Sequence, residues 1–537
     1  MTRVAEQENY RQYMPFARQP LKGIYVAQRM FTTLVMVLWW AFYYTIMPRK
    51  YRPRPSWSLR QIICVNFTRR IYKVTELAGV TWGTRNPEET CDSKTLKETH
   101  FEWVGPLPEE LRAGVIAGSE AEYKRVGVFV WPRDAPEVVK HDPKSSDAAF
   151  SEAEAGDVPL VGIFMHGGGY CHMSAHENAP TSKIPRRFIK DKAFTKIYAV
   201  EYRLLQHAPF PAQVQDAAAV YYHIVEQHQH HGGNLSGRSD DSSRTQVAKD
   251  DGVLRMDYLN AGYAPQDVQD RVANGEARAR VAQAAQNTRC KIVLIGDSAG
   301  GNLVLALARW IRDEARLPPP DGLLLLSPSC DPSHAFPESP SSYIPRPHAD
   351  TDYLVDTPEP RALLQRTFLG NHPLEMMHSP YVSPASQKVL RAFYGDAFAE
   401  SIEDLTIARM NSMNRAHLRD MASAPSTPVP CTPSEGLPGP VPMELGRSPT
   451  SLDRPIIASP RGLSLFSDFP RACVVLGDAE RLEREATKLV GAMERDGVDV
   501  KTVWVKDGAH DVLMMGWWDE NVRTLVYNDI ETWLKSI

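Results

Sequence analysis

The chain has 537 residues, a formal net charge of −4 and a sequence pI of about 6.5. This charge balance gives no basis for binding nucleic acid, and the length suits one large α/β domain with insertions better than several separate domains. Its seven cysteines show no Cys-x-x-Cys spacing, which argues against zinc and dithiol redox motifs. An odd, scattered number also argues against a disulfide scaffold, although one pair, such as Cys64 with Cys91, stays open.

The N-terminal region predicts a tail over residues 1–29 and a transmembrane anchor over residues 30–47. The stretch from Met30 to Met47 carries no charged side chain and as a helix would cover about 27 Å, enough for a thin bilayer such as the endoplasmic reticulum. Side chains that suit a membrane interface lie near its end and just after it: Trp39, Trp40, Tyr43, Tyr44, Arg49, Lys50, Arg52 and Arg54. The alternative is a buried or interfacial helix that forms part of a cap.

The orientation of this anchor does not follow from its flanking charges. Near the stretch, Arg11, Arg18, Lys22 and Arg29 precede it and Arg49, Lys50, Arg52, Arg54 and Arg60 follow it, so the positive-inside rule does not decide. The sequons at Asn66 and Asn234 would permit glycosylation of a lumenal domain. We therefore expect a single-pass protein of the endoplasmic reticulum membrane, with the lumenal side favoured for the catalytic domain.

Residues 55–150 are expected to hold a cap and the first strands, with an amphipathic helix from Ser58 to Leu77 and a strand from Val126 to Trp131. Residues 151–395 and 461–537 are expected to form the core. A polar insertion at 228–288 contains a histidine run that is better explained as solvated loop than as metal site. The segment 396–460, dense in proline and serine after residue 425, is expected to be largely disordered.

A glycine-rich string, His166-Gly167-Gly168-Gly169-Tyr170, follows the predicted strand from Leu160 to Met165. Consecutive glycines let backbone N–H groups approach a developing alkoxide that any Cβ would hold away. We expect oxyanion donors among Gly167, Gly168 and Gly169, and the string leaves open which of them donate. His166 is expected to support the loop.

A second string, Gly296-Asp297-Ser298-Ala299-Gly300-Gly301, lies between the apolar strand 291–295 and a buried helix over 302–308. Gly-x-Ser-x-Gly in a strand–turn–helix context is the nucleophile elbow. Ser298 is the predicted nucleophile, the amide of Ala299 a second oxyanion donor, and Asp297 a support for the turn.

The base and the acid are expected in loops that follow two later strands, since the chain order of α/β hydrolases is serine, acid, histidine. His510 follows the strand 501–505 and is the predicted base. The loop after the strand 472–476 offers two carboxylates, of which Glu480 is preferred as the acid and Asp478 is the alternative.

At this point the chain resembles the hormone-sensitive-lipase-like family of α/β hydrolases, which includes arylacetamide deacetylases and fungal steryl acetyl hydrolases. The likeness continues through Tyr202-Arg203-Leu204-Leu205-Gln206-His207-Ala208-Pro209-Phe210-Pro211-Ala212, Leu326-Ser327-Pro328 and Ser379-Pro380-Tyr381-Val382-Ser383-Pro384. It implies a mostly parallel central sheet flanked by helices, with a helical cap. It also implies a carboxylic ester hydrolase. Glu480 stands where many relatives carry aspartate.

These residues predict a membrane-anchored serine hydrolase that removes short acyl groups, such as acetyl, from hydrophobic alcohols such as sterols or xenobiotics. The expected partners are a small hydrophobic ester and membrane lipid. No metal or organic cofactor is expected, and the oligomeric state is open. The alternatives are an amide or formamide hydrolase with the same triad and a catalytically silent binding protein. The alternative of a silent binding protein is disfavoured because such proteins lose the catalytic base, whereas His510 is present.

Overall fold

The computed structural model describes residues 16–118, 121–134, 158–229, 290–335, 345–355, 367–403 and 464–537. Nearly all of the predicted polar insertion at 228–288, with its histidine run, lies outside these residues. Most of the predicted disordered segment at 396–460 lies outside them too. Its first eight residues, 396–403, are helical.

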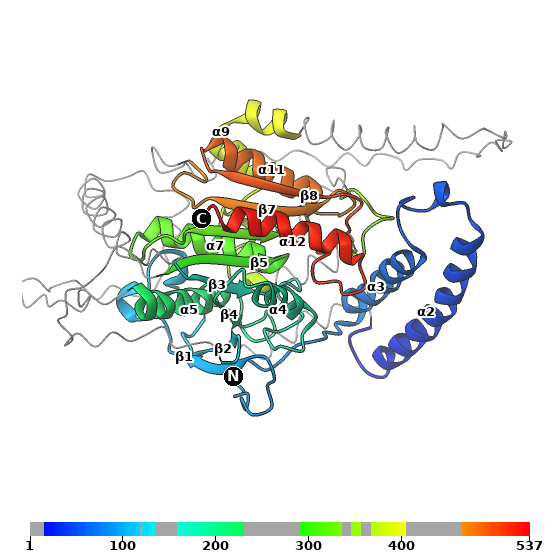
Figure 1. The fold of residues 1–537 in the computed structure, drawn as a ribbon, viewed down its shortest axis with the longest axis horizontal. Coiled ribbons are helices and arrows are strands. Elements are labelled where there is room, and N and C mark those ends of the chain that lie inside the picture. Colours follow the sequence, from blue (N-terminus) through cyan, green and yellow to red (C-terminus); the bar gives the residue numbers. More distant parts are fainter. Residues whose placement is uncertain are drawn as a thin grey trace, which may run out of the picture.

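One eight-stranded sheet forms the centre of the molecule, in the order β1-β2-β4-β3-β5-β6-β7-β8 (Figure 1). Strands β3 to β8 run parallel, whereas β2 is antiparallel to both β1 and β4. The strands are β1 (His100–Val104), β2 (Val126–Trp131), β3 (Leu160–Met165), β4 (Lys196–Glu201), β5 (Lys291–Asp297), β6 (Gly322–Leu326), β7 (Ala472–Gly477) and β8 (Val500–Val505). The sequence analysis missed β1, which is short and carries polar side chains.

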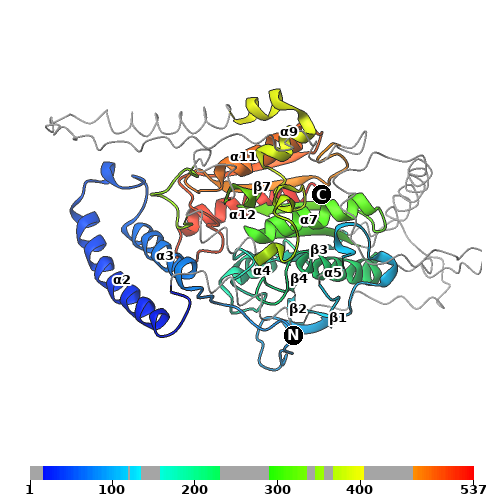
Figure 2. The same ribbon diagram turned by 180° about the vertical axis from the view of Figure 1, so that it is seen from behind.

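Helices cover both faces of this sheet, as Figures 1 and 2 show from opposite sides. They are α4 (Lys183–Lys190), α5 (Ala212–Gln229), α7 (Ala299–Glu314), α9 (Gln387–Tyr394), α11 (Glu483–Arg495) and α12 (Glu520–Leu534). Alternate side chains of a strand serve the two faces: Ile292 and Leu294 of β5 belong to one buried cluster, and Val293 and Ile295 to the other. Because both faces of the sheet are buried, the central strands consist of consecutive apolar residues.

Short 3-10 turns connect these elements, at Arg49–Tyr51, Glu109–Leu111, Gly114–Ile116, Pro180–Ser182, Pro332–Ala335 and Leu374–His378. All six cysteines within the described ranges are free thiols, so Cys64 and Cys91 do not form a disulfide.

Two N-terminal helices, α2 (Leu21–Ile46) and α3 (Leu59–Ala78), form a hairpin at one side of the domain (Figure 1). Helix α2 begins at Leu21, so residues 21–29 are helix rather than the predicted tail; the stretch contains no proline, and Gly23 lies in the first turn. Ser58 and Gln61 form a capping box at the start of α3, and Gly79, with φ of 59°, ends it. The predicted helix from Ser58 to Leu77 is therefore confirmed.

Candidate active site

Ser298 lies on a strained turn between β5 and α7. Its φ of 52° and ψ of −114° are uncommon for a residue with a side chain. A Cβ on Gly296 would come within 2.3 Å of the Gly300 carbonyl oxygen, and one on Gly300 within 1.9 Å of the Met165 carbonyl oxygen. The turn therefore requires glycine at both positions, and it exposes the Ser298 side chain at the carboxyl end of β5.

The glycine loop lies beside this turn. Gly168 and Gly169 have φ of 107° and 62°, and both line the same cavity as Ser298 and Ala299. Gly167 has a different role, because its N–H donates to the Asp297 carboxyl group. Gly168 and Gly169 are therefore the candidates for oxyanion donors in this loop. The amide of Ala299, at the first position of α7, is the third candidate donor.

His166 supports the loop from behind. Its ring is buried, stacks on Tyr202 at 4.4 Å between centroids, and places Nδ1 2.8 Å from the Gly167 carbonyl oxygen. Burial lowers the pKa of this imidazole to about 4, so the ring is neutral at pH 7. His166 does not line the cavity.

His510 is in place to accept the Ser298 proton. Its Nε2 lies 2.9 Å from Ser298 Oγ, and its Nδ1 lies 3.8 Å from Oε2 of Glu480. Glu480 is fully buried, which raises the pKa of its carboxyl group, whereas a hydrogen bond of 2.6 Å from the Ser327 hydroxyl acts in the opposite direction. Ser327 Oγ also accepts the Asp511 N–H at 3.1 Å, so this hydroxyl joins the acid loop to the histidine loop.

Asp478, the alternative acid, points elsewhere. Its carboxylate accepts the Asp507 N–H at 2.6 Å, and its carbonyl oxygen accepts a hydrogen bond from Arg54 at 2.9 Å. Asp478 does not line the cavity. Of the two candidates, the structure brings Glu480 and not Asp478 to the imidazole.

The sequence patterns did not identify Asp352 as a residue of the site. Its side chain is fully buried and accepts the Arg481 N–H at 2.7 Å and the His510 N–H at 3.3 Å. One carboxylate thus holds the backbone directly after Glu480 and the backbone of His510. No motif marks this position, because Asp352 lies in a segment far from both loops in sequence.

A second pair of carboxyl groups lies beside the triad. Asp297 and Asp511 are both buried and hydrogen-bond to each other, which requires a proton between them. Burial raises the pKa of both groups, to about 6 for Asp511. Because Asp297 also accepts the Gly167 N–H and Asp511 directly follows His510, this pair connects the glycine loop with the histidine loop.

A cavity of about 140 Å³ opens in front of Ser298. One wall is aromatic: Tyr72 of α3 packs 5.4 Å from Trp82 and 5.2 Å from Tyr353, whose ring lies 5.7 Å from that of His510. Helix α3 therefore contributes to the wall of this cavity. Leu205, Phe368 and Met514 add further apolar surface.

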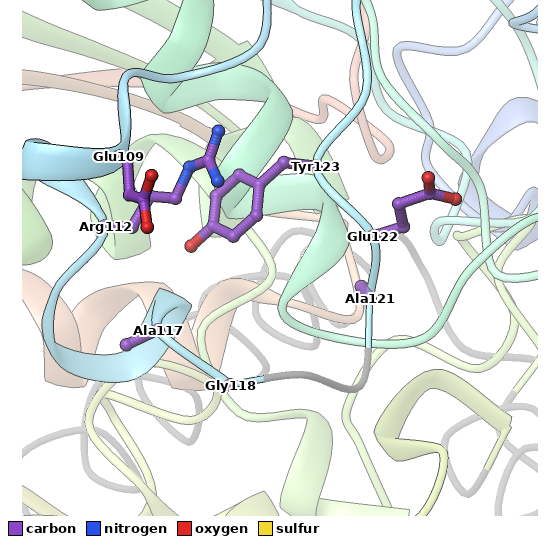
Figure 3. A pocket seen from close by; sticks show the side chains of 7 residues that line it. All are labelled: Glu109, Arg112, Ala117, Gly118, Ala121, Glu122 and Tyr123. Atoms are coloured by element: carbon purple, nitrogen blue, oxygen red, sulfur yellow. The ribbon is translucent and has the colours of Figure 1, made fainter. Parts of the chain in front are cut away.

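A larger cavity of about 720 Å³ lies between Glu109 and Tyr123 (Figure 3). Its Arg112 guanidinium lies over the Tyr123 ring, 4.2 Å from the centroid. None of its seven lining residues is a serine, histidine or cysteine.

Comparisons with known proteins agree with this architecture. Residues 162–398 match a family described as alpha/beta hydrolase fold. A search of curated proteins finds no significant match.

Solved structures with similarity to the chain include a hormone-sensitive lipase from a metagenome library (16% identity, 76% of this chain and 82% of that chain, TM-score 0.39). Others are a Pyrobaculum calidifontis esterase (16%, 81% and 85%, 0.41) and an esterase/lipase from an uncultured bacterium (14%, 93% and 98%, 0.40). The parallel sheet and the family match over residues 162–398 together give the chain the α/β-hydrolase fold, with a serine and a histidine side chain placed as in a serine hydrolase.

Proposed function

We propose that the chain is a membrane-attached carboxylic ester hydrolase that removes short acyl groups, such as acetyl, from hydrophobic alcohols such as sterols or xenobiotics. The contact that carries this proposal is the 2.9 Å hydrogen bond between Ser298 Oγ and His510 Nε2, formed in front of the glycine loop. A hydroxyl activated in this way attacks acyl carbonyls.

In the first step, Ser298 Oγ bonds to the ester carbonyl carbon while His510 Nε2 takes the hydroxyl proton. Glu480 stabilises the imidazolium through its position at Nδ1. The oxyanion receives hydrogen bonds from the amides of Ala299 and of the glycine loop. Collapse of the tetrahedral intermediate breaks the bond to the alcohol oxygen, which leaves with the proton from His510.

In the second step, water attacks the acyl-enzyme carbonyl and gives its proton to His510. The bond to Ser298 Oγ breaks, the serine recovers its proton, and the carboxylic acid leaves. Every proton that moves is held by His510 or by a reactant.

The dimensions of the cavity support a short acyl group. A cavity of about 140 Å³ is close to the volume that admits a single benzene ring. A long acyl chain would exceed that space. The aromatic wall of Tyr72 and Tyr353 offers apolar surface to the alcohol part of the substrate.

Attachment to a membrane is proposed from helix α2. It is the one helix within the described ranges with the length and hydropathy of a membrane-spanning segment, and little of it is buried. The endoplasmic reticulum remains the proposed membrane. The lumenal side now has weaker support, because Asn66 lies within α3 and its side-chain amide donates to the Ile62 carbonyl oxygen at 2.9 Å.

The test is an acyl-chain series of p-nitrophenyl esters, run beside the acetyl anilide with the purified chain and its Ser298→Ala variant. We expect kcat/KM to be highest for the acetate and butyrate esters. It should be about tenfold or more lower for the octanoate ester, because the longer acyl chain exceeds the volume of the cavity. Faster turnover of the anilide would instead establish an amide hydrolase. Absence of turnover by the unmodified chain would favour a binding protein.

A further inference from the structure

The α2–α3 hairpin is fastened at both of its ends. Near the start of α2, the Phe16 N–H donates to the Leu77 carbonyl oxygen of α3 at 3.0 Å. At the other end, the Arg52 guanidinium donates to the Tyr44 carbonyl oxygen at 3.0 Å. Helix α2 is thus held along α3 rather than standing apart from the domain.

A charged contact fastens the middle of the hairpin. Arg70 of α3 donates from Nε to the Thr33 hydroxyl and from a terminal nitrogen to the Thr32 hydroxyl, both at 3.0 Å. Thr33 has no exposed surface, although it lies inside the apolar stretch of α2. In a helix that crosses the bilayer, this contact would bring a guanidinium into the hydrocarbon region, which costs about 3 kcal/mol or more.

Helix α3 is bound to the catalytic domain and cannot follow α2 into lipid. Its Ile62 and Val65 are buried in the core cluster that includes β5 side chains. Its Arg69 donates to the Asp352 carbonyl oxygen at 2.7 Å, and its Tyr72 lines the active-site cavity. A crossing pose for α2 would therefore require the hairpin to separate.

The outer face of α2 carries large apolar side chains from Leu21 to Ile46, interrupted by the exposed Gln28, and Figure 1 shows this helix at the outer edge of the molecule. Its most exposed large side chains are Leu38 at 73%, Phe31 at 69% and Ile46 at 66%, and the same face carries Leu21, Ile24, Leu34, Val35, Trp39 and Phe42. An exposed face rich in large apolar side chains, beside a second face that α3 partly covers, suits a helix that lies at an interface.

The charge of the hairpin is complementary to an anionic surface. Residues 21–78, which the hairpin spans, contain ten lysines and arginines and one acidic residue, Glu76, in a chain whose net charge is −4. Basic residues stand at both ends of α2, including Lys22, Arg49 and Lys50. Such residues near a membrane surface attract anionic lipid headgroups.

We propose that α2 lies in the plane of an anionic bilayer surface, with its outer face in the lipid, and that this pose holds the α3 wall of the active site beside the membrane. The inference rests on the proposed function for the ester substrate, and it gives that substrate a route from the lipid to Ser298. It replaces the predicted transmembrane crossing with in-plane attachment.

Topology is tested with the full chain carrying an epitope tag at each terminus, in sealed microsomes treated with protease. In-plane attachment leaves both tags on one side, so both are digested or both are protected until detergent is added. One digested and one protected tag would show a crossing helix and overturn the inference.

Lipid binding is tested by flotation of the purified chain with vesicles of phosphatidylcholine alone or mixed with phosphatidylserine. We expect stronger binding to the mixed vesicles, weakened by salt. The double variant Leu34→Glu, Leu38→Glu should lose flotation, whereas Leu525→Glu, on the exposed face of α12, should retain it. Equal flotation of all three proteins would refute the role of the α2 face.

Activity separates this inference from the proposed function. The double variant should hydrolyse p-nitrophenyl acetate in solution like the unmodified chain, and cholesteryl acetate in mixed vesicles at least about tenfold more slowly. Equal rates on cholesteryl acetate would refute delivery from the membrane. Failure of the unmodified chain to hydrolyse p-nitrophenyl acetate would count against the proposed function instead.

Discussion

Replacing the triad acid tests the geometry around His510 most directly. Glu480→Gln keeps the size of the side chain and its hydrogen bond with Ser327 but removes its charge. At 3.8 Å between Nδ1 and Oε2, an effective dielectric constant of about 20 gives the ion pair about 4 kcal/mol. Because the imidazolium exists only as the reaction proceeds, this energy acts on the transition state. We expect kcat to fall by roughly a thousandfold, with KM little changed.

The assay is steady-state hydrolysis of p-nitrophenyl acetate, with Asp478→Asn as the matched control. That control removes a carboxylate of the same loop whose hydrogen bond goes to the Asp507 N–H and not to His510, so its kcat should change less than about threefold. A larger loss in Asp478→Asn than in Glu480→Gln would transfer the acid role to Asp478. Equal losses would refute the electrostatic reasoning.

Four further changes test other parts of the site. Ser298→Ala should abolish turnover and fluorophosphonate labelling with an unchanged circular dichroism spectrum; labelling that persists would reveal another nucleophile. Asp352→Asn should lower kcat by roughly tenfold to a hundredfold by loosening both catalytic loops, more than Asp321→Asn, a carboxylate that accepts a backbone N–H near the start of β5. Similar losses in both would indicate general destabilisation. The folded-state pKa of Asp511, about 6, exceeds its ordinary 3.8, so this group favours the fold below about pH 4 and loses up to about 3 kcal/mol of that stabilisation as the pH rises past 6. Urea unfolding of Asp511→Asn at pH 5 and pH 8 should show a smaller difference than the unmodified chain, and an unchanged difference would refute the assignment. Deletion of residues 1–47 should release a soluble protein that still cleaves p-nitrophenyl acetate, and loss of that activity would show that α2 helps to build the site.

Local sequence patterns were sufficient to predict the strand and the turn that carry Ser298, the proposed nucleophile. The strand before Ser298 is apolar on both faces and the turn needs glycine at two positions, so β5 and the elbow follow from short-range physics. The strand predicted over Val126 to Trp131 and the helix from Ser58 were found for the same reason. In contrast, β1 is too short and too polar to stand out without its partner β2.

The sequence by itself indicated the fold class and the proposed nucleophile and base, because the patterns that point to them involve neighbours within a few positions. Only the tertiary structure shows that Glu480 lies at His510 and that Asp478 does not, because the local sequence does not say which carboxylate of one loop faces the imidazole. The same holds for Asp352, whose role comes from two N–H groups that lie more than a hundred residues away. Likewise, a hydropathy pattern shows that α2 is apolar, but not that Arg70 holds its inner face against α3. Contacts between distant segments form when the whole chain packs, and no local pattern encodes them.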